Sequence, residues 1–581
     1  MMQAEYDKLY DQVTTPDLTL GDEGGCTFPQ INYRVSSLKE FEGCKTVYEV
    51  EFAEHVEDLD FSLPKMELTY SIKVTNTNLK TLSFFVPGES LIENEAIHGG
   101  PPSLSRTLSQ LFAIHFVASF QLLDMVLPVD FIWAVSSSHY QVDRGGFKQG
   151  RGQSTWDAIR AEPGRIRDGS NENDGIEGYE NCKEDIQLIK NLGASHYRFS
   201  IDWARILPNG TIDEINEEEI QHYRDFLLAL KEAGITPIAT LFHIDWPLVL
   251  YDQGGWRNPL SQKWFSDFCD LCFQRFGDLI KIWMTINEIG MHLLSAICKL
   301  EGQPYHCPTR PEPEEGDAAI FVAAHNMLLA HAKVYRNYEK NYKDKFGGKV
   351  GLVAGGMGWC VGEDKEVSAR ATDFNLGHTL DPVIFGDYPE SMKNRLTGEN
   401  GTPKLPSFTE EEKSLMKNSV DFLGLNYYLP RLVAPGVGTS LLEKLGQYKL
   451  QRNNWEKISG ESWCRNYPEG LLDIFRRLKD QYENIPVMIA ENGCTDLVGA
   501  GLEDDNRIKL LQQHVEVCQQ AITEGCNVFG YAVWCLMDNF EWEDGFAARF
   551  GMYYVDHKDP EKKRVPKKSV SFYRALIHSH K

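Results

Sequence analysis

The feature of this 581-residue chain that most constrains its fold is a series of eight short apolar runs that begins soon after residue 127. None of the runs alternates apolar and polar residues, and such uniform runs are typical of strands buried on both faces of a sheet. Segments with helical apolar spacing, such as 178–194 and 320–340, lie between them. Strand and helix alternating in this way predict an α/β fold, the (β/α)8 TIM barrel. The runs are 131–135, 196–200, 236–242, 280–286, 350–354, 421–426, 486–490 and 529–534.

The first part of the chain has a different pattern. Residues 47–52 and 66–74 alternate apolar and polar side chains with a period of two, which predicts half-buried strands of an antiparallel sheet. The stretch 98–106 is rich in Gly, Pro and Ser and is typical of a linker. We therefore expect an N-terminal extension over residues 1–125, containing β-structure and of unknown function, followed by the barrel over residues 126–578.

Charge and cysteine content narrow the classes of ligand. The formal net charge of -25 argues against nucleic acid or an anionic membrane surface as a partner, since both would be repelled. The 13 cysteines are scattered, and Cys269 and Cys272 lie in a segment with helical apolar spacing, which favours core packing. No cluster of residues has the spacing of a metal site or a phosphate-binding loop, so we expect no metal and no cofactor.

One apolar stretch raises the question of a membrane. Residues 108–127 are long enough for a span but include Gln110, His115, Ser119, Gln121 and Asp124, which favours a buried amphipathic helix. A signal anchor stays open, so membrane association is left undecided. The first residues are too polar for a signal peptide, which favours a cytoplasmic location, with secretion or anchoring as alternatives. The sequence does not predict the oligomeric state.

Polar and aromatic side chains lie within the predicted strands or follow their carboxyl ends. In TIM barrels these ends form one rim, and the chemistry takes place there. The residues expected at this rim are Gln141, Arg198, His243, Asn287, Glu288, Asn426, Tyr428, Glu491, Trp534, Glu541 and Trp542.

Two carboxylates in this group suggest a reaction. Glu288 follows the fourth predicted strand and Glu491 the seventh, so they come from opposite sides of the barrel mouth. Glycosidic cleavage uses such a pair, with one group protonated for the leaving oxygen and the other ionised toward an oxocarbenium-like centre. The alternatives are a solvated strand end for Glu288 and a hairpin turn for Glu491. For Trp534 and Trp542, the alternative to sugar stacking is core packing.

A series of ordered motifs then identifies a family. From about residue 127 to about residue 577 the chain resembles the β-glucosidases of glycoside hydrolase family 1, which have lactase-like and klotho-like relatives. The motifs are FIWAVSSSHYQVD, YRFSIDWARILPNG, FHIDWPLVLYDQGGW, MTINE, LDPVIFGDYPE, DFLGLNYY, MIAENG, VWCLMDNFEWEDGFAARFG and KRVPKKS. The resemblance implies a retaining β-glycosidase that forms a covalent glycosyl-enzyme intermediate and takes a small-molecule β-glycoside as substrate.

The resemblance also implies a role for each rim residue. Glu288 would be the general acid/base and Glu491 the nucleophile, with carboxyl groups about 5–5.5 Å apart. Arg198 and Tyr428 would contact the nucleophile and favour its ionised form, and Asn287 would bind the sugar 2-hydroxyl. The remaining substrate-binding residues would be Gln141, His243, Asn426, Trp534, Glu541 and Trp542, with Trp534 stacking beneath the sugar ring.

The chain departs from the family pattern at several positions. Ile289 replaces a proline after the Asn-Glu pair, and Ile244 replaces a tryptophan after His243, while Trp246 stands two residues farther on. The segment 176–182 lacks the histidines, and the tyrosine directly before Lys183, that are common in the family. These changes leave both carboxylates in place but keep two alternatives open: a non-catalytic klotho-like binding protein or co-receptor, and an enzyme that mainly transfers sugar to an acceptor.

Overall fold

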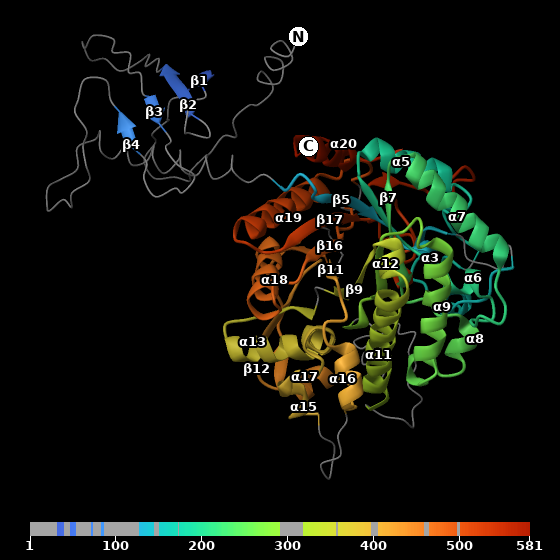
Figure 1. Cartoon of the computed structure of the whole chain (residues 1–581). Coiled ribbons are helices and arrows are strands. Elements are labelled where there is room, and N and C mark those ends of the chain that lie inside the picture. The colour runs from blue at the N-terminus through green and yellow to red at the C-terminus, as the bar shows by residue number, and fades with distance from the viewer. Residues whose placement is uncertain are drawn as a thin grey trace, which may run out of the picture. The chain divides into compact units, whose positions relative to one another are not determined.

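The computed structural model describes a barrel-forming region and the backbone of four short N-terminal strands (Figure 1). The described ranges are 127–143, 150–171, 173–290, 318–355, 358–396, 405–457, 464–496 and 500–580, together with strands β1 to β4. The chain divides into two compact units, Met1–Ala113 and Ile114–Lys581.

The four N-terminal strands form two antiparallel pairs. β1 (Asn32–Lys39) pairs with β2 (Val47–Ala53), and β3 (Ser71–Lys73) pairs with β4 (Ser83–Phe85). β2 and β3 lie in the two stretches whose alternation predicted strands, although β3 is shorter than its stretch. The apolar stretch 108–127 lies outside the described residues except for Leu127. Within the described part of the chain, no helix combines the length and apolar character needed to cross a membrane.

Eight parallel strands of the second unit close into a barrel, as predicted. Neighbouring strands follow the order β11-β16-β17-β5-β6-β7-β8-β9, and the ring closes between β9 and β11. Each strand matches one predicted run to within two residues at either end. The strands are β5 (Ile132–Ser136), β6 (His196–Ser200), β7 (Thr236–Phe242), β8 (Ile282–Asn287), β9 (Lys349–Gly355), β11 (Phe422–Asn426), β16 (Val487–Asn492) and β17 (Val528–Trp534).

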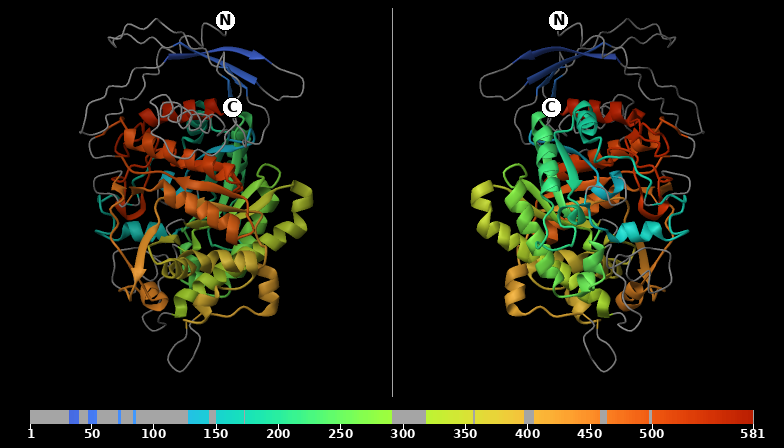
Figure 2. Two further views of the ribbon diagram at one scale, coloured as in Figure 1. Left: turned by 90° about the vertical axis from the view of Figure 1, so that its left-hand side faces the viewer. Right: turned by 90° about the vertical axis from the view of Figure 1, so that its right-hand side faces the viewer.

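Helices surround the barrel and cover the outer face of its strands (Figures 1 and 2). The longer ones turn an apolar face inward, and two of them lie over the segments 178–194 and 320–340, whose spacing predicted helices. They are α5 (Cys182–Leu192), α7 (Glu217–Glu232), α9 (Ser261–Phe276), α11 (Ala318–Asn341), α13 (Lys365–Thr372), α14 (His378–Phe385), α16 (Glu410–Met416), α18 (Pro468–Gln481), α19 (Asp505–Thr523) and α20 (Lys568–Ser579). Three short helices follow barrel strands or their turns: α3 (His139–Val142), α6 (Trp203–Ile206) and α8 (Leu248–Tyr251).

Two apolar layers stabilise this architecture. The larger fills the space between strands and helices. It includes Cys269 and Cys272 of α9, which are buried, as the helical spacing predicted, and are free thiols. The smaller is a separate cluster of side chains contributed by the strands themselves: Ala134, Ile238, Met284, Val353, Phe422, Met488, Ala490 and Ala532. These apolar side chains fill the interior of the barrel, and the polar groups of the site lie at the carboxyl ends of the strands.

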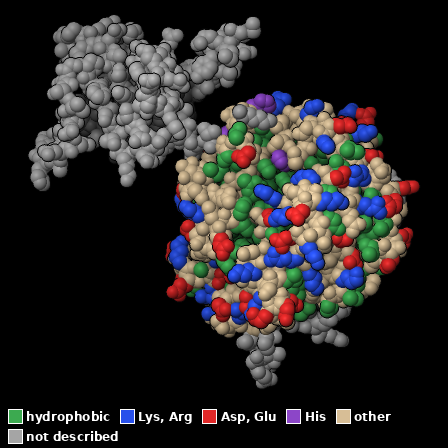
Figure 3. Space-filling model, viewed as in Figure 1, with side chains coloured by type: hydrophobic (Ala, Val, Ile, Leu, Met, Phe, Trp, Pro, Cys, Tyr) green, Lys and Arg blue, Asp and Glu red, His purple; other side chains and the backbone are tan. Residues whose placement is uncertain are grey.

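Charged side chains of both signs are interspersed over the outer surface in the view of Figure 3. The excess of acidic residues is therefore not gathered into a single patch on that face.

Candidate active site

The two carboxylates predicted from the sequence lie at the carboxyl ends of two barrel strands. Glu288 is the first residue after β8, and its backbone N–H donates to the carbonyl of Val353 on the neighbouring strand at 2.9 Å. Glu491 is the last residue but one of β16. Because β16 pairs in parallel with both β11 and β17, the alternative of a hairpin turn at Glu491 is wrong.

A glycine on the neighbouring strand leaves room for the Glu288 side chain. Gly355 ends β9, and a Cβ atom added there would lie 3.2 Å from Oε1 of Glu288. That distance is shorter than ordinary van der Waals contact, so any side chain at position 355 would press on the carboxylate.

Glu491 is buried and held at both oxygens. Arg198 Nη1 donates to Oε1 at 2.6 Å, and the Tyr428 hydroxyl donates to Oε2 at 3.0 Å. The charge-assisted bond to a guanidinium stabilises an ionised carboxylate. Burial, and after it the Glu491 charge, raises the pKa of Tyr428 well above its ordinary value, so Tyr428 stays a hydrogen-bond donor.

Arg198 is itself fixed by the barrel wall. The side chain is 1% exposed, and its Nε donates to the Thr240 hydroxyl at 3.1 Å while Nη1 also donates to the carbonyl of Ala490 at 3.2 Å. The remaining nitrogen, Nη2, donates to Oδ1 of Asn287 at 2.7 Å. The guanidinium therefore has little freedom to follow the carboxylate if Glu491 moves.

Glu288 has different surroundings. Its Oε1 accepts a hydrogen bond from Asn426 Nδ2 at 3.1 Å, and the same amide donates to Asn287 Oδ1 at 3.1 Å. Burial, and after it the charge of Glu491, raises the pKa of Glu288 to about 8. Glu288 is therefore protonated at neutral pH. A hydrogen-bonded path runs between the two carboxylates from Glu491 through Arg198, Asn287 and Asn426 to Glu288.

A second polar group lies where β5 and β17 end. Gln141, on α3, donates through Nε2 to the carbonyl of Phe540 at 3.0 Å and to Oε2 of Glu541 at 3.1 Å. The Ser138 hydroxyl donates to Oε1 of Gln141 at 2.7 Å and so fixes the amide. Burial, and after it the charge of Glu491, raises the pKa of Glu541 to about 8. Glu541 belongs to the hydrogen-bonded group around Gln141.

Aromatic rings complete the rim. The ring of His243, which follows β7, is nearly parallel to that of Trp534, with centroids 5.9 Å apart and planes 8° apart. It is also nearly parallel to Trp542, at 6.1 Å and 19°. Trp246 does not take part. It is fully buried against Trp203 and Trp256, so the displaced tryptophan belongs to the core and does not replace the missing aromatic at position 244.

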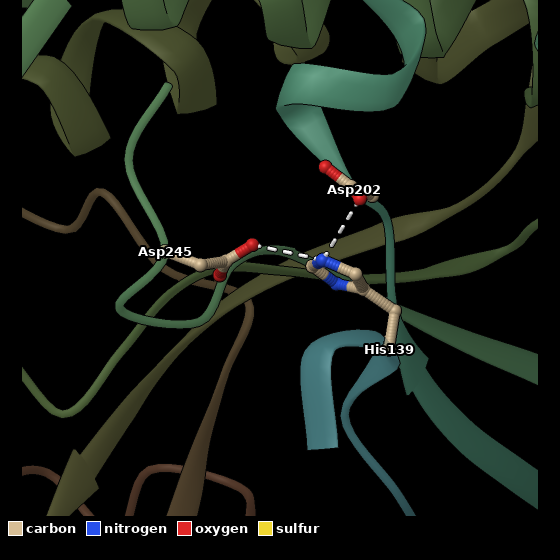
Figure 4. Close-up of side chains that lie close together, drawn as sticks. All are labelled: His139, Asp202 and Asp245. Atoms are coloured by element: carbon tan, nitrogen blue, oxygen red, sulfur yellow. Dashed lines mark ion pairs between the residues drawn. The ribbon is translucent and has the colours of Figure 1, made fainter. Parts of the chain in front are cut away.

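Sequence reasoning missed several side chains behind the rim. Ser138 and Thr240 orient Gln141 and Arg198, but a hydroxyl in an apolar run carries no signal of its own. His139, Asp202 and Asp245 converge behind the rim with ligand-type atoms within 4.8 Å of one another (Figure 4). Ionisable residues in otherwise apolar strand ends were the available signal for these three.

Two cations, the His139 ring and the Arg151 guanidinium, neutralise the carboxylates of this group. His139 Nε2 lies 2.9 Å from Asp245 Oδ2 and 3.3 Å from Asp202 Oδ2. Arg151 Nε donates to the same Oδ2 of Asp202 at 2.6 Å. Burial tends to raise the pKa of Asp202, but Arg151 and His139 outweigh it and bring that pKa well below its ordinary value. The Asp202 oxygen that faces His139, Oδ2, already accepts a hydrogen bond from Arg151 and is not free to bind a metal ion. These residues therefore form an ion-pair cluster.

Comparison with known proteins places the chain in a family. The model of glycosyl hydrolase family 1 matches residues 123–581. The chain is 37% identical to beta-glucosidase 40 of Arabidopsis thaliana over 479 residues, which covers 78% of this chain and 92% of that protein. It is 33% identical to myrosinase 1 of Brevicoryne brassicae over 473 residues, which covers 79% of this chain and 100% of that protein.

Solved structures agree. The β-glucosidase of the fungus Humicola insolens, in complex with glucose, has a TM-score of 0.72 at 35% identity and covers 78% of this chain and 99% of its own. A rice β-glucosidase, solved as a mutant in a covalent complex with Glc, has a TM-score of 0.71 at 33% identity and covers 78% of this chain and 98% of its own. With the eight-stranded barrel and two rim carboxylates, these matches show that the chain belongs to glycosyl hydrolase family 1 and is a glycoside hydrolase.

Proposed function

We propose that this retaining β-glycosidase uses Glu491 as its nucleophile and Glu288 as its general acid/base. The observation that carries the assignment is the contrast between the two carboxylates. Glu491 accepts from a guanidinium at 2.6 Å, whereas Glu288 accepts from an amide and has its pKa raised to about 8. An ionised and a protonated carboxyl at one site are what double displacement requires.

In the first step, an oxygen of Glu491 attacks the anomeric carbon, and the bond from that carbon to the leaving oxygen breaks. Glu288 gives its proton to the leaving oxygen, so the aglycone departs as a neutral alcohol. The products of this step are a glycosyl ester on Glu491 and an ionised Glu288.

In the second step, Glu288 acts as a base. Once Glu491 is esterified it has no charge, so the second cause of the raised pKa of Glu288 disappears and the ionised form becomes easier to hold. Glu288 then takes a proton from a water that attacks the anomeric carbon, and the ester bond to Glu491 breaks. Two inversions at one carbon retain the β-configuration.

The remaining rim residues suit a neutral sugar. Asn287 is oriented by Arg198 and Asn426, which favours it as the partner of the 2-hydroxyl. Gln141 and Glu541 form a hydrogen-bonded pair that presents donors and acceptors, and Trp534 offers a flat apolar face. Neither Gln141 nor Glu541 carries a positive charge that would bind a phosphorylated sugar. We therefore propose an uncharged β-glucoside as the preferred substrate, in line with the relatives named above.

The test is a hydrolysis screen of the full chain with p-nitrophenyl β-glycosides of glucose, galactose and fucose. We expect turnover of the β-glucoside, and NMR of the first-formed sugar should show the β-anomer. The isosteric variant Glu491→Gln is the control for contaminating activity. The family match gives no support to the non-catalytic klotho-like alternative. Tight binding of a protein partner without turnover of any β-glycoside would nevertheless overturn the proposal.

A further inference from the structure

Three neighbouring turns at the rim are joined by one histidine. β5, β6 and β7 are adjacent in the barrel, and each is followed by a charged residue: His139 after β5, Asp202 after β6 and Asp245 after β7. Figure 4 shows the three side chains pointing toward one another from these turns. None of them has a role in the proposed chemistry.

Two of the turns also carry residues of the proposed sugar site. Gln141 is two residues after His139 on the short helix α3, and His243 is two residues before Asp245. A shift of His139 against Asp245 is therefore expected to change the separation of Gln141 and His243. A four-residue helix and a turn without regular structure have few backbone hydrogen bonds of their own to prevent such a shift.

His139 is fixed on both sides of its ring. Its backbone N–H donates to the Ser200 hydroxyl at 2.9 Å, and Nδ1 lies 2.9 Å from the same hydroxyl. Nε2 forms ion pairs with the Asp245 and Asp202 carboxylates. The attraction is therefore one of charge. Burial lowers the pKa of His139, but the two carboxylates outweigh it and raise that pKa to about 10, so the ring is cationic at neutral pH.

The turn that carries Asp245 is strained. Ile244, between His243 and Asp245, has φ of 91°, in the left-handed region that a β-branched side chain rarely adopts. Such a conformation persists only where the surroundings impose it. Here the surroundings are the rings of Trp534 and Trp542 stacked near His243 on one side and the ion pair of Asp245 on the other.

We propose that His139 is a positioning residue of the sugar site: by pairing with Asp245 and Asp202 it holds the turns after β5, β6 and β7 in register, so that Gln141 and His243 stay at the separation that the sugar requires. This inference rests on the proposed function, since it assigns Gln141 and His243 to the sugar. It predicts an effect on sugar affinity that is larger than the effect on the chemical step.

The experiment compares His139→Gln, which removes the charge, with His139→Lys, which keeps a cation within reach of Asp245. Asp245→Asn and the double variant His139→Gln/Asp245→Asn complete a cycle. His222→Gln is the matched control, because His222 is half-buried and stacks on Tyr179 without joining the rim turns. Kinetics are measured with p-nitrophenyl β-glucoside and with analogues that each lack one hydroxyl, and thermal unfolding is followed in parallel.

We expect His139→Gln to raise KM about tenfold with a smaller change in kcat, and His139→Lys to recover part of the loss. The double variant should resemble the single ones. Removing one hydroxyl from the substrate should raise KM less in His139→Gln than in the wild type. The hydroxyls for which this holds should be the same as in Gln141→Ala and His243→Ala. His222→Gln should leave KM unchanged.

Equal loss at every hydroxyl, or a lower unfolding temperature with unchanged KM, would overturn the proposal and leave His139 a purely structural residue. Loss of wild-type activity on chelation, restored by a divalent cation, would also overturn it in favour of a metal site. Failure of the proposed function is separable, because it would appear as absence of turnover in the wild type. In that case the same variants are compared for calorimetric binding of the glucose-shaped inhibitor 1-deoxynojirimycin, and unchanged affinity would again reject the proposal.

Discussion

Glu288 and Glu491 are the same kind of residue at the same rim, yet their surroundings differ. Glu491 is the last residue but one of its strand and is enclosed by Arg198 and Tyr428, whereas Glu288 follows its strand and accepts from the amide of Asn426. The guanidinium of Arg198 stabilises the ionised form of Glu491. Glu288 has no cation bonded to it among the described residues, and burial raises its pKa. Under the proposed assignment, Arg198 of β6 favours Glu491 over Glu288 as the nucleophile.

The largest expected effect comes from removing the proposed nucleophile. Glu491→Gly should lower kcat about 10⁴-fold or more, because no covalent intermediate can form. Azide should restore turnover by occupying the vacated space and attacking the anomeric carbon from the α-face. The product is then the α-glycosyl azide, identified by NMR. Recovery of the β-glycosyl azide instead would reverse the assignment of the two glutamates.

Removing the proposed acid/base should cost less and give the opposite product. Glu288→Ala should lower kcat about 10²- to 10⁴-fold with poor leaving groups. Here azide attacks the glycosyl-Glu491 ester from the β-face and yields the β-glycosyl azide. Aryl glucosides with acidic phenols should lose little in the glycosylation step, since they need no proton. A uniform loss across leaving groups would contradict the role of Glu288.

The raised pKa of Glu288 predicts a pH profile. The proton that it donates is lost as the pH rises through about 8, so kcat/KM should fall about tenfold for each further pH unit. The alkaline limb should be absent for 2,4-dinitrophenyl β-glucoside, whose leaving group needs no acid. Because the pKa of Glu541 is raised to a similar value, Glu541→Gln is the control. Persistence of the limb in Glu541→Gln assigns it to Glu288, and its disappearance there would assign it to Glu541.

The smallest effect concerns two adjacent tyrosines. Tyr428→Phe removes the hydrogen bond to Glu491 and should lower kcat about tenfold, as expected for a bond to a charged group. Its neighbour Tyr427 donates to the carbonyl of Tyr467 at 2.5 Å, away from the carboxylates. Tyr427→Phe should therefore keep normal kinetics and cost about 1 kcal/mol of the free energy of unfolding. Equal kinetic losses in both variants would mean that Tyr428 acts only through packing.

Much of the fold could be predicted because strands buried on both faces of a sheet consist of short, uniformly apolar runs that are easy to identify in a sequence. All eight barrel strands were anticipated, and Glu288 and Glu491 were expected at their ends. β1 and β4 were not anticipated, and β3 proved shorter than its stretch, since antiparallel strands depend on partners that the local pattern does not specify. The function of residues 1–125 and the boundary proposed there stay predictions.

The site was less accessible to sequence reasoning where it depends on distant contacts. The bonds of Arg198 to Glu491 and Asn287 join residues 293 and 89 positions apart, and only the closed barrel brings them together. The displacement of a tryptophan from position 244 to position 246 also could not be interpreted from sequence, because the ring at 246 turns into the core. Likewise, the ion pairs of His139 with Asp202 and Asp245 join residues that follow three different strands, so they could not be predicted without the closed barrel.

The central assignment, that Glu491 forms the covalent bond, has one direct measurement. The enzyme is incubated with 2,4-dinitrophenyl 2-deoxy-2-fluoro-β-glucoside, whose fluorine slows the second step so that the glycosyl ester accumulates, and the peptic digest is mapped by mass spectrometry. We predict one added fluoroglucosyl group per chain, located on Glu491. A label on Glu288 or Glu541, or continued hydrolysis of the reagent with no accumulation of labelled protein, would contradict the assignment.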